Sequence, residues 1–276
     1  MAVTDIYHVS GGLKGRFSAV FIGGNVDDYV QVNAAAVART AASDTVGTFT
    51  AWINVPDDTG TYTIVGNGDD NAVEFIDVGI EAGKLASRCT DATVVQYVSV
   101  TDAIVIKPHR WQHVAFVQRA NNEGINFYVD GVRVASTNST TTDVNEWYNN
   151  CYGLDTMRIG ASNKAGDASV TNEFKGAISD VKYWSAALTD DEVMSDYLNQ
   201  PVQAASLQSH WDFKDDYVDN GLGADNGTVV GDVVLSNSYS EFSSRMRFMT
   251  GVPVVADSLV CFAYDGTGHA IVIQAA

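Results

Sequence analysis

The sequence predicts an all-β chain, in which two antiparallel sheets pack face to face with one short helix and a β-rich C-terminal extension. Asp130-Gly131 lies between two alternating apolar runs, and this is the strongest local signal for a hairpin, because both central turn positions take positive φ. Residues 48–55 alternate strictly between apolar and mixed faces. Gly, Thr, Ser, Asn and Asp are plentiful, while long Leu-, Glu- or Lys-rich tracts are missing, so strands and turns are favoured over helices.

Strands bounded by turn residues are expected throughout the first half of the chain. They cover 16–22, 29–32, 48–55, 62–65, 72–80, 84–89, 94–100 and 104–107. The alanine-rich residues 34–43 fit either a helical turn or a loop.

The second half continues with strands at 111–117, 157–160, 174–184, 207–213 and 228–235, and with the hairpin at 125–135. One segment reads as a helix: Thr189 and Glu192 form a capping box, an apolar face follows, and Pro201 ends it. A further hairpin is expected within 258–273. We therefore expect an N-terminal arm over 1–15, a sandwich over 16–242 and a C-terminal β extension over 243–276.

The chain carries 34 acidic and 16 basic residues, a formal net charge of −18. Such a surface argues against nucleic-acid partners and against anionic lipid. The N-terminus lacks a basic segment followed by an apolar run, so no secretory signal and no membrane insertion are expected. The three cysteines form no Cys-x-x-Cys pair, and their odd number does not resemble a secreted disulfide framework.

Six short motifs occur in the order typical of one group of β-sandwiches. They are 24–30 (GNVDDYV), 49–53 (FTAWI), 111–114 (WQHV), 128–131 (YVDG), 158–160 (RIG) and 174–181 (FKGAISDV). The chain resembles the laminin-G-like and pentraxin-like members of the concanavalin A-like jelly-roll family over residues 16–200. The resemblance implies a jelly-roll sandwich that binds glycans or surface proteins, sometimes through calcium, rather than a catalyst.

Two clusters of Asn and Asp are candidates for a structural Ca²⁺ site, since calcium prefers six to eight oxygen ligands from loops. One contains Asn25, Asp27 and Asp28, and the resemblance adds Asp180 from the closing strand. The other spans residues 67–71. The alternative is that these residues only form turns. Our hypothesis for a metal site names Asn25, Asp27 and Asp180.

A loop over 143–152 is rich in aromatic and amide side chains. Trp147, Tyr148, Asn149 and Tyr152 could form a flat platform for a sugar. The alternative is that the aromatic rings are buried and fix the loop to the sandwich.

Catalysis is not expected. Glycosidases of the resembled group carry acids two residues apart on one strand. The candidates here are Glu74, Asp77 and Glu81, and because Glu74 and Asp77 are three apart, a regular strand would point them to opposite faces. His109 and His113 lie on a strand-like segment and do not form a helical metal pair, so His113 is expected to satisfy a core hydrogen bond.

These patterns favour a non-catalytic surface protein of a larger assembly, namely a capsid decoration or fibre of a virus or phage that touches host glycans. Its partners would be a capsid protein or sister subunits, reached through the apolar termini; the alternative is a tail that folds back on its own sandwich. The expected location is the virion surface. A free lectin-like protein exported by a non-Sec route is the second reading, and an accessory module of a carbohydrate-active enzyme is the third.

Overall fold

The computed structural model describes residues 16–21, 27–164, 170–237, 260–264 and 270–274. The chain divides into two compact units, one over 16–236 and one that joins residues 1–15 to 237–276. In the second unit, β17 (Val260–Tyr264) pairs antiparallel with β18 (Ala270–Gln274), as the hairpin prediction requires.

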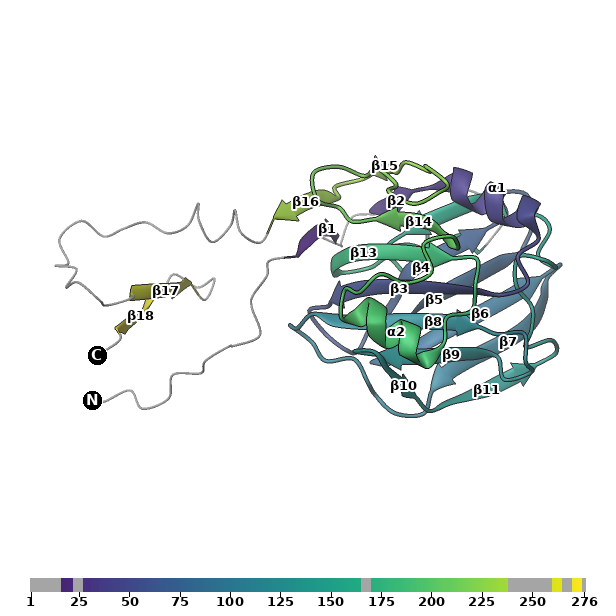
Figure 1. Ribbon diagram of the computed structural model, residues 1–276, viewed down its shortest axis with the longest axis horizontal. Helices are drawn as coiled ribbons and strands as arrows, with labels where there is room; N and C mark the ends of the chain where they lie inside the picture. Colours follow the sequence, from purple (N-terminus) through teal and green to yellow (C-terminus); the bar gives the residue numbers. More distant parts are fainter. Residues whose placement is uncertain (1–15, 22–26, 165–169, 238–259, 265–269, 275–276) are drawn as a thin grey trace. The chain divides into compact units, whose positions relative to one another are not determined.

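The larger unit is a sandwich of two antiparallel sheets, which confirms the predicted fold class (Figure 1). The first sheet runs in space through β10 (Val132–Val134), β9 (Ile125–Val129), β8 (Gln112–Gln118), β3 (Gly47–Asn54), β13 (Gly176–Trp184), β1 (Phe17–Phe21) and β16 (Val234–Asn237). β14 (Leu207–Trp211) also pairs with β13, farther along the same edge that β1 pairs with.

The second sheet has eight strands within the described residues. In spatial order they are β11 (Ser136–Thr141), β7 (Val94–Thr101), β6 (Lys84–Asp91), β5 (Phe75–Glu81), β4 (Thr61–Gly68), β12 (Thr156–Ile159), β2 (Tyr29–Gln31) and β15 (Thr228–Val230).

The core lies between the sheets and follows the predicted alternation. On β3, Phe49, Ala51 and Ile53 join the main apolar cluster, while Thr50 and Trp52 point to the opposite face. Because successive strand side chains alternate, each strand of the sandwich offers one row to the core and one row to the outer surface.

The Asp130-Gly131 turn between β9 and β10 is confirmed, with φ of 49° and 79° at its two residues. The capping box is also present: Thr189 accepts a hydrogen bond from the Glu192 amide, and the Glu192 carboxylate accepts from the Thr189 amide. The helix that follows, α2 (Asp190–Tyr197), covers the outer face of the first sheet over Trp184 and Tyr128 (Figure 1).

Four local expectations change. The predicted strand over 228–235 is two strands, β15 and β16, which belong to different sheets. Residues 33–42 form a second helix, α1 (Asn33–Ala42), where the sequence had left a loop open. The predicted strand over 104–107 is wrong, because the amides of Val105 and Ile106 both donate to the Gly83 carbonyl instead of to a strand. β11 was not predicted, since its six residues are all Ser, Thr or Asn and show no apolar alternation. No helix in the described part of the chain is long and apolar enough to span a bilayer.

Candidate functional site

The outer face of the second sheet is hollowed between β4, β5 and β6. On β5, Ile76, Val78 and Ile80 point into the core, so Asp77 and Glu81 face outward. β6 follows the same rule, with Leu85 and Cys89 in the core and Ala86 and Arg88 on the outer face.

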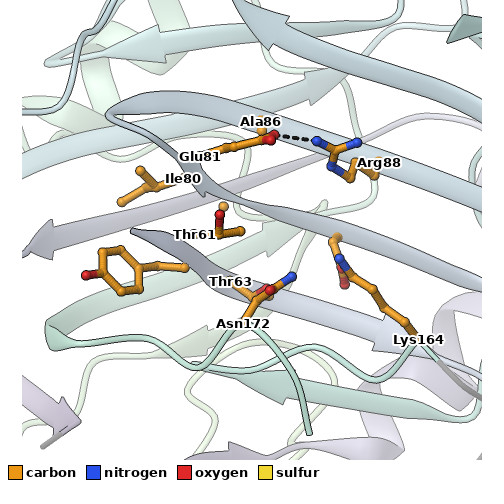
Figure 2. A pocket seen from close by; sticks show the side chains of 11 residues that line it. Thr61, Thr63, Ile80, Glu81, Ala86, Arg88, Lys164 and Asn172 are labelled. Carbon is orange, nitrogen blue, oxygen red and sulfur yellow. Dashed lines mark hydrogen bonds and ion pairs between the residues drawn. The ribbon is translucent and has the colours of Figure 1, made fainter. Parts of the chain in front are cut away.

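Small residues form the floor of this hollow. Gly79 of β5 pairs directly with Ala86 of β6, so little side-chain volume fills the centre of the outer face. Polar and charged groups line its sides. Figure 2 labels Thr61, Thr63, Glu81, Arg88, Lys164 and Asn172, and Asp77 lines the hollow with them. We call this set the sheet hollow.

Residues 161–164 and 170–172 lie across the sheet at one side of the hollow, and we call these two stretches the crossing segment. A Cβ atom on Gly66 would lie 2.5 Å from the Ala161 carbonyl oxygen and 2.8 Å from the Ser162 Cα, so the crossing requires glycine at this position. The crossing segment is tied down by paired hydrogen bonds between Ser162 and Thr171 and by donation from the Thr63 amide to the Asn172 carbonyl. It brings Lys164 and Asn172 against strands that lie far away in sequence.

Asp77 is the buried acid of the sheet hollow. Its Oδ2 accepts a hydrogen bond from the Ser162 hydroxyl at 2.6 Å and lies 3.1 Å from the Lys164 ammonium. Its Oδ1 has no hydrogen-bond partner among the described residues. Burial raises the pKa of Asp77, and the charge of Lys164 opposes that shift without cancelling it. An acceptor is thus left unpaired beneath the hollow. It is closed off from solvent, so a ligand hydroxyl reaches it only when the hollow opens.

The remaining charges of the hollow lie nearer to solvent. Arg88 forms an ion pair with Glu81, and both side chains are about one-third to two-fifths exposed, at 34% and 41% (Figure 2). Lys164 also lies over the Phe75 ring, 5.3 Å from its centroid. With two cations, two carboxylates and an amide, the hollow offers both donors and acceptors to a polar ligand.

The predicted aromatic platform does not form. Trp147 and Tyr148 are both fully buried: the Trp147 indole donates to the Tyr183 hydroxyl at 3.3 Å, and the Tyr148 hydroxyl donates to Asn67 at 2.7 Å. The alternative reading, in which the rings fix the loop, is the correct one for these two residues. Of the other two, Asn149 is partly buried, and its backbone N–H donates to the Asp44 carbonyl. Tyr152 is 76% exposed.

Of the proposed calcium ligands, Asp180 has other partners. Asn25 is outside the described residues, and the Asp27 backbone amide donates to the Glu173 carboxylate. Asp180 lies 2.9 Å from the Lys182 ammonium and 2.6 Å from the His210 imidazole. Within the described ranges, no three His, Cys, Asp or Glu side chains are grouped as a metal site. Calcium binding stays a prediction.

The second Asn/Asp cluster consists of hydrogen-bonded turn and strand residues. Asn67 accepts from Tyr148, Asp69 accepts from the Asn71 amide at 2.6 Å, and Asp70 accepts from Asn163 at 2.8 Å. These contacts match the turn-forming alternative.

The candidate acids are not arranged as a catalytic pair. Glu74 precedes β5, and its carboxylate accepts from the Gly153 amide at 3.1 Å. Asp77 and Glu81 share the outer face but are four strand residues apart, about 13 Å between Cα atoms. Each also has a basic partner, Lys164 or Arg88.

The two histidines are separate from the sheet hollow. His113 is buried on β8 with its Nε2 3.0 Å from Asp196, which confirms the predicted core hydrogen bond. His109 is in a loop with φ of 59°, not on a strand as its sequence context had indicated.

Sequence reasoning did not find Arg88, Lys164 or Asn172. The signal for Arg88 was present, since it alternates with core residues on a strand. Nothing in the local pattern places Lys164 or Asn172 on the sheet, because they reach it through the crossing segment.

Three solved structures illustrate the similarity of fold. The CBM40 of a Ruminococcus gnavus sialidase, bound to α2,3-sialyllactose, is 14% identical with a TM-score of 0.52, over 64% of this chain and 97% of that one. The NanB sialidase of Streptococcus pneumoniae, as its K499G mutant, is 19% identical with a TM-score of 0.52, over 64% of this chain and 28% of that one. A heptameric SAP-like pentraxin from Limulus polyphemus is 12% identical with a TM-score of 0.50, over 81% and 95%.

The family comparison agrees with the arrangement of strands. No curated protein matches the chain. The family model described as the concanavalin A-like lectin/glucanases superfamily matches residues 23–194, which include the β5 and β6 strands of the sheet hollow and its Lys164 and Asn172. The chain therefore belongs to the concanavalin A-like lectin/glucanase superfamily.

Proposed function

We propose that this protein binds glycans without catalysis, and that the sheet hollow is the binding site. The observation that carries the proposal is the buried Asp77 carboxylate, whose Oδ1 has no partner among the described residues. This oxygen is closed off from solvent, so the proposal requires the hollow to open for the sugar. A sugar hydroxyl donating to the oxygen would then satisfy it, and an unsatisfied buried acceptor costs about 1–3 kcal/mol. Arg88, Lys164 and Asn172 provide donors for neighbouring sugar oxygens.

The structural similarities support a sugar rather than another polar ligand. A solved structure with this fold is a carbohydrate-binding module holding sialyllactose, and the family name joins lectins with glucanases. Between these two activities, the partners of Asp77 and Glu81 favour binding. Each carboxylate forms an ion pair, with Lys164 or Arg88, instead of facing a second carboxyl group as the acids of a glycosidase do.

The test is glycan-array screening followed by calorimetric titration of the best ligand. Arg88→Gln should weaken binding at least tenfold, because a charge-assisted hydrogen bond is lost. Arg133→Gln is the matched control: Arg133 is also a strand arginine paired with a glutamate, Glu123, but it lies on β10 of the first sheet. Equal loss of affinity in both variants, or an array without any bound glycan, would contradict the proposal.

The wider role remains a proposal of its own. A glycan-binding sandwich suits a virus or phage surface component, a free lectin or an enzyme's accessory module equally well. Mass measurement of the purified protein, with a search for it in assembled particles, separates these roles: a lectin binds sugar alone, whereas a decoration protein is recovered with capsid.

A further inference from the structure

Two cysteines that are distant in sequence meet in the core of the sandwich. The Sγ atoms of Cys89 and Cys151 are 3.5 Å apart, although 62 residues separate them along the chain. Both side chains are fully buried. Cys89 is on the core face of β6, and Cys151 is in the loop that follows β11.

Contacts that do not involve sulfur fix both positions. Cys89 lies between Ile76 of β5 and Tyr97 of β7 in the ladder of the second sheet. The loop is held by the buried Trp147 and Tyr148, and the Cys151 amide donates to the Trp147 carbonyl at 3.2 Å. The proximity of the sulfurs is therefore built into the backbone of the fold.

We propose that Cys89 and Cys151 form a disulfide bond when the protein folds in an oxidising environment. A disulfide has an S–S distance of about 2.05 Å, so the two sulfurs must approach each other by about 1.5 Å. A small rotation of the two side chains can supply such a shift. The proposal does not depend on glycan binding.

The reaction needs an external disulfide, such as oxidised glutathione. One cysteine thiolate attacks it and releases one glutathione thiolate, which gives a mixed disulfide. The second cysteine thiolate then attacks the protein sulfur of that intermediate and displaces the second glutathione. Two protein thiols are oxidised and one glutathione disulfide is reduced to two thiols.

In the finished fold both thiols are enclosed. The Cys151 thiol donates to Glu146 Oε1 at 3.9 Å. Burial raises the pKa of Cys89 well above its usual value, so in the finished fold this thiol stays protonated. The bond is therefore expected to form during folding, before the core closes over the sulfurs.

The bond would join the centre of the second sheet to a loop that reaches the first. Trp147 of this loop packs edge-on against Phe49 of β3, with ring centroids 6.0 Å apart. Closing a chain loop of this length restricts the unfolded state, and the expected rise in Tm is about 10 °C.

The experiment uses the full chain, refolded from denaturant with oxidised and reduced glutathione, then alkylated and digested with trypsin. The three cysteines fall in different tryptic peptides, 89–110, 134–158 and 248–276. A linked pair of 89–110 with 134–158 is the expected product. In Cys261→Ser, the oxidised protein should weigh about 2 Da less than the reduced form, show no free thiol after denaturation and melt about 10 °C higher.

Matched variants keep the outcome clear. Cys89→Ala and Cys151→Ala, each combined with Cys261→Ser, retain one core thiol and should show neither the intrachain mass loss nor the rise in Tm. If Cys261→Ser refolds in the redox buffer with two alkylatable thiols, the cysteines only pack together and the proposal is overturned. Links that involve Cys261 instead, in the wild-type chain, would overturn it as well.

Discussion

The imidazole Nε2 of His113 lies 3.0 Å from Oδ2 of Asp196, and this contact ties β8 to α2 across 83 residues of chain. A carboxylate can only accept, so Nε2 carries the hydrogen. Asp196 also accepts from the Thr50 hydroxyl and the Lys182 ammonium, each at 2.8 Å. The helix is thus anchored to the first sheet by one buried acid with three donors.

We expect Asp196→Asn to lower the free energy of unfolding by about 3 kcal/mol at neutral pH, because breaking a buried ion pair leaves Lys182 and His113 poorly compensated. Thermal or denaturant unfolding measures this. Asp191→Asn is the control on the same helix, where the side chain is exposed, and it should change stability by less than about 1 kcal/mol. Equal effects would show that the anchor contributes little.

Asp196 also predicts how stability responds to acid. Burial alone would raise the pKa of Asp196, but the hydrogen bond from His113 and the charge of Lys182 outweigh it and lower the pKa. A carboxyl with a lowered folded-state pKa stabilises the fold above its unfolded pKa of about 3.9, and this contribution is lost as the pH falls through the folded value. Wild-type stability should therefore drop below about pH 4, and Asp196→Asn should flatten part of that drop.

A second prediction concerns the loop that fills one end of the core. Tyr148→Phe should lower the free energy of unfolding by about 1–2 kcal/mol. The Tyr148 hydroxyl donates to Asn67 Oδ1 at 2.7 Å, and no other described residue donates to that buried oxygen. Tyr152→Phe alters the same kind of side chain in the same loop at 76% exposure, and should stay within about 0.5 kcal/mol. Urea unfolding of both variants decides whether the loop is fixed by its buried tyrosine.

Short-range patterns predicted the elements whose structure is decided locally. The alternation at Phe49 to Trp52 fixed the face of β3, and Thr189 with Glu192 marked the start of α2. β11 was not predicted because an edge strand can pair with its neighbour without an apolar row of side chains. Its residues alternate between partly buried and exposed, and none is fully buried.

The candidate site was only partly accessible from sequence. The alternation of β6 places Arg88 on the outer face, but Lys164 arrives through a crossing that depends on the missing side chain of Gly66. Trp147 and Tyr152 illustrate the same limit: both are aromatic residues of one loop, yet tertiary packing buries one and exposes the other. Composition identifies such a loop without deciding which rings are free.

The hairpin glycine gives a third prediction. Gly131 has φ of 79°, and an added Cβ would lie 2.9 Å from the Met194 sulfur of α2. Gly131→Ala should therefore cost about 1–2 kcal/mol, from left-handed strain and a tight contact with the helix. Val132→Ala, at a neighbouring position that is 57% exposed, should be nearly neutral. A neutral Gly131→Ala in thermal unfolding would show that the turn and helix adjust freely.

The fourth prediction separates binding from stability at Asp77. Burial raises the pKa of Asp77 despite Lys164, so the folded state binds this proton more readily than the unfolded state does. Such a group stabilises the fold most below its unfolded pKa, and the contribution declines as the pH rises through the folded value. At about pH 7 the charged form of Asp77 therefore lowers the stability of the fold, whereas the charged form of Asp196 raises it.

Asp77→Asn should keep or raise the Tm at that pH while weakening glycan binding at least tenfold, because the anionic acceptor is lost. Paired calorimetry and thermal unfolding test this, and a variant that loses Tm along with affinity would place Asp77 in the scaffold rather than in the binding site.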